Sequence, residues 1–340
     1  MASAGETTAP RLLGVGSPIV DLAARVDDAF LRRSVPGGKG GTLHVSGDEL
    51  EALVSRLPSP PQLLPGGSAG NTVAALTRLG VRAALLGKLG RDERGRFYLD
   101  EVRKRGGIES FIATVPGGRT GTCLTFTTPD GERTMRSDLG VSAELTAEEA
   151  AAAEFAGIEW VLTEGYMVDA PGFEEVFRRA RAAGCRIAFD PGSFELARRH
   201  RELFLSVLGN YAELALVNRA EAESLCGPGS PEMLAEKLSS YCPTVVLKLG
   251  GDGALVKRRG AKTLRIPAVK VESVVDTTAA GDYFAAGFFY GILSGRSLRD
   301  AGACGAQLAA AIVQLDGTEL PASVWESLRR SLAARGPSNQ

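Results

Sequence analysis

The sequence predicts an α/β fold in which a mostly parallel central sheet is flanked by helices and a small β-sheet lid lies beside it. Three observations support this prediction. From about residue 160 onward, short apolar strands alternate with helices. Two earlier β segments have polar surroundings that do not suit the middle of a sheet. The length of 340 residues exceeds the usual size of a single core, so we expect one large α/β domain with an appendage, or two domains.

The first part of the chain supplies the start of the central sheet and both exposed β segments. Alternation on either side of residues 129–131 (PDG) predicts a hairpin. The exposed strands together form the predicted lid, from about 21–46 and 108–138. In order, the predicted elements are strands at 11–16, 22–26 and 42–45, a helix at 48–57, a helix opened by residues 65–71 and ending at 79, a strand at 82–86, a helix at 93–104, and strands at 120–128 and 132–137.

The second part of the chain alternates strands and helices as a parallel sheet requires. Helices of this length between strands predict right-handed βαβ units. The predicted strands are 160–163, 186–189, 214–217, 244–248 and 254–257, and the predicted helices are 173–183, 194–208, 231–241, 282–293, 298–314 and 324–334. Residues 11–335 are thus expected to form the α/β domain with its lid, after a disordered N-terminal tail at residues 1–10.

The composition excludes several classes of protein. A formal net charge of −1 gives no bulk attraction to nucleic acid or to acidic membranes. The five cysteines form no CxxC pair and the chain has only two histidines, so a zinc site is not expected. Scattered cysteines, an N-terminus unlike a secretory signal, and the lack of an apolar run of roughly 20 residues predict a cytoplasmic protein.

The chain is organised around residues 274–291 (VVDTTAAGDYFAAGFFYG). Small residues let a backbone approach a ligand closely, and a helix is expected to start at Ala280. A helix start offers free N–H groups and the positive end of a dipole, which suit an anion such as phosphate. Asp282 would lie in the first turn, where a carboxylate can deprotonate an alcohol beside a phosphate under transfer. Taken alone, the stretch fits a buried turn with a helix-capping aspartate better.

Another candidate follows the first strand, because open α/β sheets bind ligands outside the carboxyl ends of their strands. Residues 14–21 (GVGSPIVD) match a dinucleotide GxGxxG only in part. Ile19 stands at the third glycine position and Pro18 would disturb the helix start, so a dinucleotide site is rejected. Asp21 suits hydroxyl recognition, because a carboxylate can accept two hydrogen bonds from a sugar diol. A turn aspartate is an equal alternative for this residue alone.

Three further segments each have a ligand-binding and a purely structural explanation. Gly66 and Gly67 permit close backbone approach and positive φ, and Asn71 adds an amide that faces either a polyol or its own backbone. Asn218 and Glu221 either cap a helix or orient water on Mg²⁺. A glycine-rich turn at residues 248–253 (KLGGDG) either holds a nucleotide or forms a hairpin without a ligand. No GxxxxGK[ST] sequence occurs, so a P-loop kinase is excluded.

Together these segments resemble the ribokinase-like (PfkB) carbohydrate kinase family. Residues 276–282 (DTTAAGD) resemble its DTxGAGD signature, and residues 66–71 (GGSAGN) resemble its GGxxxN signature. Residues 218–221 (NRAE) match its NxxE, and residues 250–253 (GGDG) match its nucleotide-site turn. The motifs occur in the family's order over residues 11–320. Other stretches, at 14–21, before Gly66 and at 127–135, look most like adenosine-kinase-type members and related bacterial sugar kinases.

The resemblance implies a large α/β domain with a small β lid, and transfer of the γ-phosphoryl group of ATP to the primary hydroxymethyl of a ribonucleoside or furanose sugar. ATP and Mg²⁺ are the implied cofactors, and K⁺ near Asp276 is a further option. The expected partner is a small sugar or nucleoside, with no nucleic acid and no membrane. A homodimer formed through the exposed lid sheet stays open.

The resemblance also implies a role for each candidate residue. Catalysis is assigned to Asp282 as the base and to an anion hole of N–H groups at Ala279, Ala280, Gly281 and Asp282. Substrate binding is assigned to Asp21, Gly66, Gly67, Asn71 and, reaching from the lid to the phosphates, Arg133. Nucleotide binding is assigned to Asn218, Lys248, Gly250, Gly253 and Thr277. The cation sites are Glu221, holding Mg²⁺ through water, and Asp276 for K⁺.

One position departs from the family pattern, because Ala279 stands where glycine is usual. If the backbone there needs positive φ, alanine costs about 1 kcal/mol or more. If the backbone N–H groups of the anion hole are displaced as a result, each misplaced donor costs roughly 3–4 kcal/mol of transition-state stabilisation. Because Gly281 and Asp282 are kept, we expect a negative φ and a harmless methyl group. The alternatives to a kinase are a binding protein of the same fold with lost or weak catalysis, and an NAD-dependent oxidoreductase supported only by Gly14-x-Gly16.

Overall fold

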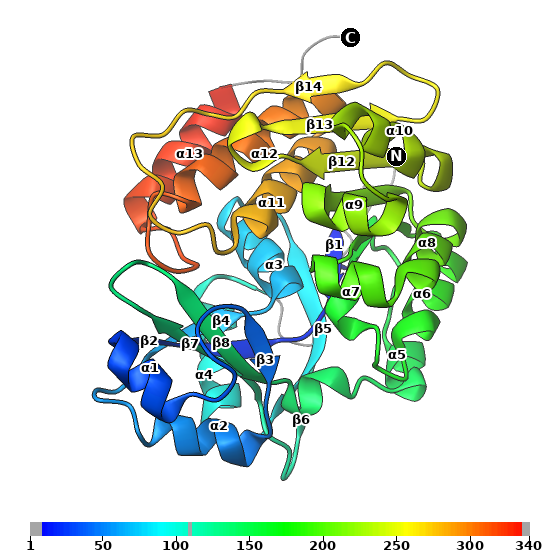
Figure 1. Ribbon diagram of the computed structural model, residues 1–340. Helices are drawn as coiled ribbons and strands as arrows, with labels where there is room; N and C mark the ends of the chain where they lie inside the picture. The colour runs from blue at the N-terminus through cyan, green and yellow to red at the C-terminus, as the bar shows by residue number, and fades with distance from the viewer. Residues whose placement is uncertain (1–8, 108–110, 335–340) are drawn as a thin grey trace.

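Residues 9–107 and 111–334 are described by the computed structural model, where a nine-stranded sheet lies between two layers of helices and a five-stranded sheet lies to one side (Figure 1). The predicted α/β fold, with a large, mostly parallel sheet and a second small sheet, is confirmed. The tail predicted at residues 1–10 falls almost wholly outside the described residues.

The large sheet positions the strand ends that matter for function. Its strands are β1 (Leu12–Val15), β5 (Ala83–Gly90), β6 (Ile112–Val115), β9 (Trp160–Glu164), β10 (Arg186–Asp190), β11 (Leu214–Asn218), β12 (Thr244–Lys248), β13 (Ala254–Arg258) and β14 (Leu264–Ile266). Their order is β14-β13-β12-β11-β10-β9-β1-β5-β6. Strands β6 to β12 in this order run parallel, and β13 pairs antiparallel with β12 and β14. The carboxyl ends of the central parallel strands therefore meet at one edge.

Helices on the two faces of the large sheet enclose two apolar cores (Figure 1). One core lies beneath α3 (Ser68–Arg78), α11 (Ala280–Leu293), α12 (Leu298–Ile312) and α13 (Ala322–Ala334), and it continues under the small sheet. The other lies beneath α5 (Ala147–Ala152), α6 (Phe173–Ala182), α7 (Phe194–Arg199), α8 (Arg201–Asn210), α9 (Arg219–Cys226) and α10 (Pro231–Tyr241). Within the described ranges, no helix combines the length and the apolar character needed to cross a membrane.

The small sheet has the order β3-β8-β7-β2-β4. Its strands are β2 (Ile19–Arg25), β3 (Thr42–His44), β4 (Gln62–Gly66), β7 (Gly121–Thr127) and β8 (Arg133–Asp138). One face packs on the core together with α1 (Asp28–Ser34), α2 (Gly47–Val54) and α4 (Glu93–Lys104). Along β2, the alternate residues Ile19, Asp21 and Ala23 are only partly buried, whereas Val20 and Leu22 are buried in the core. The partly buried residues therefore lie on the other face of this sheet.

Several expected boundaries differ from the structure. β4 joins the small sheet although no strand was expected there, because prolines at 60, 61 and 65 hide the pattern. β6 lies within the predicted lid range but pairs with β5 in the large sheet. The helix expected at 194–208 is divided into α7 and α8 at His200, whose φ of −111° and ψ of 30° are not helical. No proline or glycine announces that break.

The helices α3 and α11 lie side by side with their first turns at the edge where the strands end (Figure 1). α3 follows Gly67 at φ 95° and α11 follows Ala279 at φ 58°, and neither has a side-chain cap from the residue before it. In α3 the N–H of Ala69 donates to the buried carboxylate of Glu164, 2.7 Å away. No such acidic acceptor contacts the first turn of α11 among the described residues. The start of α11 is therefore the one left open to an anion.

Candidate active site

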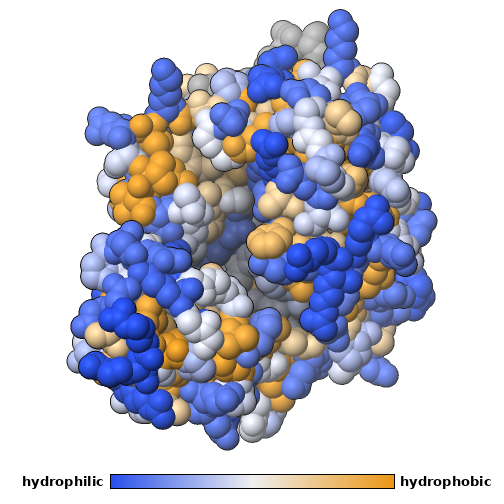
Figure 2. All heavy atoms as spheres, viewed as in Figure 1, coloured by the Kyte–Doolittle hydropathy of each residue, from blue (hydrophilic) through white to orange (hydrophobic). Residues whose placement is uncertain are grey.

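A hollow at the centre of one face separates the small sheet from the strand ends of the large sheet (Figure 2). Hydrogen bonds join the loop after β1 and the first turn of α3 to the end of β9, the first turn of α3 to that of α11, and the end of β12 to the end of β10. Candidate residues from distant parts of the chain are thus brought together.

Asp282 lies in the first turn of α11, as expected. Its Oδ1 accepts a hydrogen bond from Ser68 Oγ at 2.6 Å and its Oδ2 accepts one from Asn71 Nδ2 at 2.9 Å. Burial raises the pKa of Asp282 to about 6, against the effect of these two hydrogen bonds. Asn71 was expected to face a polyol, but its amide group donates to Asp282. The carboxylate is thus held in one orientation with a pKa that suits a general base.

The turn before α11 differs from the expectation in two ways. Ala279 has φ 58°, so the expected negative φ is wrong. In the described chain it is the one non-glycine residue with positive φ. The N–H of Ala280 donates to the carbonyl of Thr277 at 3.2 Å, so this N–H closes the turn and is not a free member of the anion hole. Ala279 packs against the main apolar core, which helps to hold the strained backbone in place.

The substitution Ala279→Gly is expected to raise the free energy of unfolding by up to about 1 kcal/mol. It removes a left-handed cost of about 1–2 kcal/mol, which the greater chain entropy of glycine partly offsets. Turnover is expected to change less than about threefold, because glycine prefers the same backbone. Ala280→Gly is the matched control, since it places glycine at the first position of α11, where no left-handed cost is removed, and it should lower stability by up to about 0.5 kcal/mol. Urea unfolding measures the free energy of unfolding of both variants. An equal loss of that free energy in the two variants would contradict the strain at position 279.

Asp276 anchors the same turn from its other side. Its Oδ1 accepts hydrogen bonds from the N–H and the Oγ1 of Thr278 and from Arg133 Nη1 at 2.8 Å, and its Oδ2 accepts one from the N–H of Gly317 at 3.3 Å. Burial acts to raise the pKa of Asp276, but the hydrogen bonds and the charge of Arg133 outweigh it and lower that pKa. A carboxylate has about four lone-pair sites. Three of these contacts fall on Oδ1 and one on Oδ2, so Oδ2 keeps a lone pair, and the role of Asp276 as a ligand to K⁺ stays a prediction.

Arg133 was expected to reach the phosphates from the lid. Instead its guanidinium pairs with Asp276, whose side chain is only 9% exposed. This ion pair joins the small sheet to the turn before α11. A hydrogen bond between charged groups is stronger than one between neutral groups, so this contact helps to fix the turn.

Asp21 was expected in a loop after the first strand, but it lies on strand β2 of the small sheet. Its carboxylate packs against Gly66, where an added Cβ would lie 2.3 Å from Oδ2. Gly67 has φ 95°, and an added Cβ there would lie 2.3 Å from the carbonyl oxygen of Ser17. Both glycines therefore show the close approach that was predicted, and Gly67 also has the predicted positive φ. Burial raises the pKa of Asp21 to about 7, against the opposing charge of Arg133.

A cavity of about 350 Å³ lies against the start of α11 and against α12. Its apolar wall is lined by Ala268, Val269, Val271, Val274, Phe284, Ala306, Ala309, Ala310 and Val313. Its polar end is lined by Asn218, Lys248, Gly250, Gly251, Gly253, Thr277, Ala280 and Gly281. All the residues predicted to bind nucleotide therefore line one cavity, which has the apolar body and few polar groups typical of a cofactor site.

Asn218 and Glu221 form a reciprocal cap at the start of α9. The Asn218 side chain accepts from the N–H of Glu221, and Glu221 Oε2 accepts from the N–H of Asn218 at 2.8 Å. Burial raises the pKa of Glu221 to about 7. Among the described residues no three His, Cys, Asp or Glu side chains are grouped to hold a metal. Glu221 is 2% exposed and both of its oxygens accept from Asn218, whereas Asn218 itself lines the nucleotide cavity. The pair therefore fits a role toward Mg²⁺ through water, which this cation usually keeps.

Sequence reasoning missed three residues of the site. Ser68 donates to Asp282, and Glu164 accepts from the N–H groups of Ser17 and Ala69, each at 2.7 Å. Asp190 accepts a hydrogen bond from Lys248 Nζ at 2.8 Å. Glu164 and Asp190 are the last residues of β9 and β10. An acidic residue directly after an apolar strand is the signal that could have found both of them.

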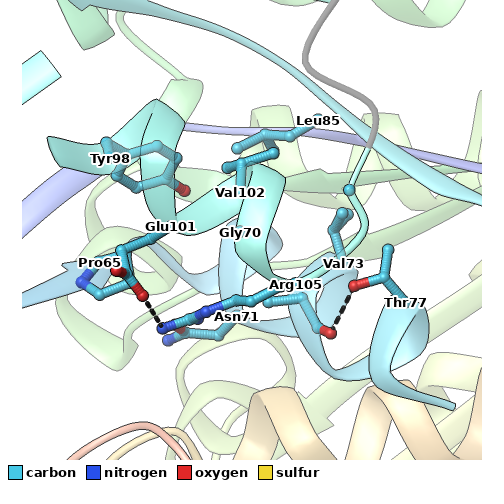
Figure 3. Close-up of a pocket in the computed structure, with 12 residues that line it drawn as sticks. Pro65, Gly70, Asn71, Val73, Thr77, Leu85, Tyr98, Glu101, Val102 and Arg105 are labelled. Atoms are coloured by element: carbon cyan, nitrogen blue, oxygen red, sulfur yellow. Dashed lines mark hydrogen bonds and ion pairs between the residues drawn. The ribbon is translucent and has the colours of Figure 1, made fainter. Parts of the chain in front are cut away.

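A second cavity lies behind α3, between it and α4 (Figure 3). Asn71, Tyr98 and Arg105 contribute to its lining, and Tyr98 donates a hydrogen bond to the carbonyl of Gly66 at 3.2 Å. Its volume is about 20 Å³, which is enough for roughly one water molecule. This cavity is too small for an acceptor, so the cleft beside Asp21 is the candidate acceptor site.

Comparison with known proteins agrees with this geometry. Residues 46–325 match the model of the pfkB family carbohydrate kinases. The structure of an adenosine kinase from Sinorhizobium meliloti is 32% identical, with a TM-score of 0.84 over 95% of this chain and 99% of the other. A 2-dehydro-3-deoxygluconokinase from Bacillus subtilis is 30% identical over 81% of this chain and 88% of its own length. An aminoimidazole riboside kinase from Salmonella typhimurium is 28% identical over 77% of this chain and 87% of its own.

These relatives act on different sugars and nucleosides, as their names state, but all are kinases. Kinases of this family are phosphotransferases that act on hydroxyl groups, with ATP as the phosphate donor and typically with Mg²⁺. The match covers far more than half of the chain. The chain therefore belongs to the pfkB family of carbohydrate kinases, and it is a sugar or nucleoside kinase.

Proposed function

We propose that this chain transfers the γ-phosphoryl group of ATP to the primary hydroxymethyl of a ribonucleoside, adenosine-like, or of a furanose sugar. The observation that carries the proposal is the placement of Asp282. Its carboxylate lies in the first turn of α11, whose residues Ala280 and Gly281 line the nucleotide cavity, and it interacts electrostatically with Asp21 of the small sheet. A base between a donor cavity and an acceptor cleft is what in-line transfer requires.

The acceptor is proposed to bind in the cleft of the small sheet. Asp21 accepts hydrogen bonds from a sugar diol, and Gly66 and Gly67 let the sugar approach the backbone without a side chain in the way. The oxygen of the Asn71 amide is left for a hydroxyl group while its nitrogen holds Asp282. An adenosine-like acceptor is favoured by the S. meliloti adenosine kinase, whose chain is matched over 99% of its length.

The nucleotide is proposed to lie in the apolar cavity, with its phosphates toward α11. Val269, Val274 and Val313 line the wall that suits a nucleobase. Thr277 and the glycines of the 250–253 turn line the phosphate end with backbone groups. Asn218 and Glu221 are proposed to hold Mg²⁺ through water, and the bound cation would neutralise phosphate charge.

In the transfer step, Asp282 accepts the proton of the hydroxymethyl group as its oxygen attacks the γ-phosphorus. Ser68 and Asn71 hold the carboxylate toward the acceptor. The N–H groups of Gly281 and Asp282, in the first turn of a helix, stabilise the charge on the phosphoryl oxygens. The Arg133–Asp276 ion pair keeps the turn before α11 in position when the small sheet is closed over the cleft.

A panel of acceptors tests the proposal. The purified chain is incubated with MgATP and with adenosine, other ribonucleosides, ribose and fructose, with and without K⁺, and ADP release is measured. We expect turnover with at least one ribonucleoside or furanose, and a rise in turnover on adding K⁺ would support the predicted cation site at Asp276. Binding of a nucleoside in a calorimeter without any ADP formed would support a binding protein instead. Phosphate found on a hydroxyl group other than the hydroxymethyl, located in the product by phosphorus NMR, would contradict the proposal.

The pH dependence of turnover is expected to report Asp282. Its pKa of about 6 means that the base becomes protonated below pH 6. At saturating acceptor and MgATP, which keep Asp21 and Glu221 engaged, kcat should fall about tenfold per pH unit below pH 6 and level off above pH 7. Rates between pH 5 and 8.5, with circular dichroism at each pH to confirm folding, measure this. A constant kcat from pH 5 to 8 would contradict the assignment of the base.

A further inference from the structure

The ammonium group of Lys248 lies against the start of α11. Lys248 is the last residue of β12, and its side chain is 14% exposed. A Cβ added at Gly281 would lie 3.2 Å from Lys248 Nζ. The same nitrogen donates to Asp190 Oδ2 at 2.8 Å. A buried cation is therefore held beside the two N–H groups that we place in the anion hole.

The charges around Lys248 are mostly negative. Asp190, Glu221 and Asp282 all interact electrostatically with its ammonium. Burial acts to lower the pKa of Lys248, but Asp190 and Glu221 outweigh it and raise that pKa, so the group stays protonated. Of the side chains that line the nucleotide cavity, all within the described chain, Lys248 is the one that carries a charge. Incoming phosphates would meet acidic groups and this single cation.

The anion hole also has fewer free donors than the sequence suggested, because the N–H of Ala280 donates to Thr277. A further donor at the same place would compensate for that loss. Phosphoryl transfer depends on neutralising charge on the oxygens of the transferred group. An ammonium group is a compact charge with three donors, so it can keep one hydrogen bond to a carboxylate while it donates another to a phosphate.

Resting on the kinase function proposed above, we infer that Lys248 donates to the phosphoryl group under transfer, and that Asp190 is the positioning residue that holds its ammonium at Gly281. In this step the bond between the acceptor oxygen and the γ-phosphorus forms, the bond from that phosphorus to the β-phosphate oxygen breaks, and ADP leaves. The acceptor proton passes to Asp282, and Lys248 stays protonated throughout.

The test uses Lys248→Met, Asp190→Asn and the double variant, with MgATP and the best acceptor from the panel. Lys248→Met is expected to lower kcat by about 10²–10³-fold, as the loss of one such donor does elsewhere. The dissociation constant for MgADP, which lacks the transferred group, should change less than about threefold. Because the charge of Lys248 lowers the pKa of Asp282, the acid limb of the pH profile should move to higher pH.

The double variant separates a catalytic from a structural role. Lys248→Met alone leaves Asp190 buried without its cation, which can damage the fold. Adding Asp190→Asn removes that unpaired charge, so a purely structural lysine predicts recovery of kcat to near the wild-type value. If Lys248 acts on the phosphoryl group, the double variant stays as slow as Lys248→Met. Recovery of kcat in the double variant, or a kcat of Lys248→Met within threefold of wild type, would overturn the inference. A wild-type protein that is inactive with every acceptor would instead overturn the kinase proposal itself.

Discussion

Asp282→Asn is expected to lower kcat by about 10²–10⁴-fold while the dissociation constants for MgATP and acceptor change less than about tenfold. A general base typically contributes a factor of this size, and an amide cannot accept the hydroxyl proton. The asparagine side chain has nearly the same shape, so it can still accept a hydrogen bond from Ser68 or from Asn71. Initial rates at saturating substrates and calorimetric titrations with MgATP and with acceptor measure the two effects separately.

Two further variants make this result specific. Asp169→Asn removes an exposed carboxylate, and it should leave kcat within about twofold of wild type. Ser68→Ala removes one of the two hydrogen bonds that orient Asp282, and about a tenfold loss of kcat is expected from the looser carboxylate. Full activity in Asp282→Asn would remove Asp282 from the mechanism, and equal losses in Asp169→Asn would point to general damage.

The sequence was most informative where a local pattern decides the structure. Alternating strands and helices predicted the parallel sheet, and the helix start at Ala280 predicted the place of Asp282 in the first turn. Gly67 could be placed at positive φ because only glycine tolerates both that backbone and the close approach of Ser17. In each case the residue type and its neighbours in sequence determine the conformation.

The sequence was least informative where contacts join distant segments. The pairing of Arg133 with Asp276 brings together a lid strand and the turn before α11, 143 residues apart in sequence. The bond from Asn71 to Asp282 spans 211 residues, so the amide was assigned to the acceptor and not to the base. At Ala279 the residue type itself favoured negative φ, and tertiary packing overrode that preference. Such contacts depend on the assembled fold and carry no local signal.

Glu164→Leu is expected to lower the free energy of unfolding by on the order of 3 kcal/mol, with a fall in Tm of roughly 4–5 °C. Glu164 is 1% exposed, and its two oxygens accept from the N–H groups of Ser17 and Ala69. Leucine fills a similar volume but leaves both buried N–H groups without an acceptor. These N–H groups belong to the loop before Asp21 and to the first turn of α3, so kcat should fall as well.

Glu164→Gln and Glu154→Leu are the controls for this loss. Glutamine keeps one carbonyl oxygen, so about half of the destabilisation is expected. Glu154 is exposed, and its replacement should change stability by less than about 0.5 kcal/mol.

Burial raises the pKa of Glu164 to about 7 in the folded chain, from an ordinary value of 4.5. Between pH 4.5 and 7 the folded protein binds the proton of Glu164 more tightly than the unfolded chain does. Protonation of Glu164 therefore stabilises the fold fully below pH 4.5, and this contribution is lost as the pH rises through 7. The loss in free energy of unfolding caused by Glu164→Gln should therefore be larger at pH 5.5 than at pH 8. Urea unfolding at both pH values measures it. A larger loss at pH 8 would refute the raised pKa of Glu164.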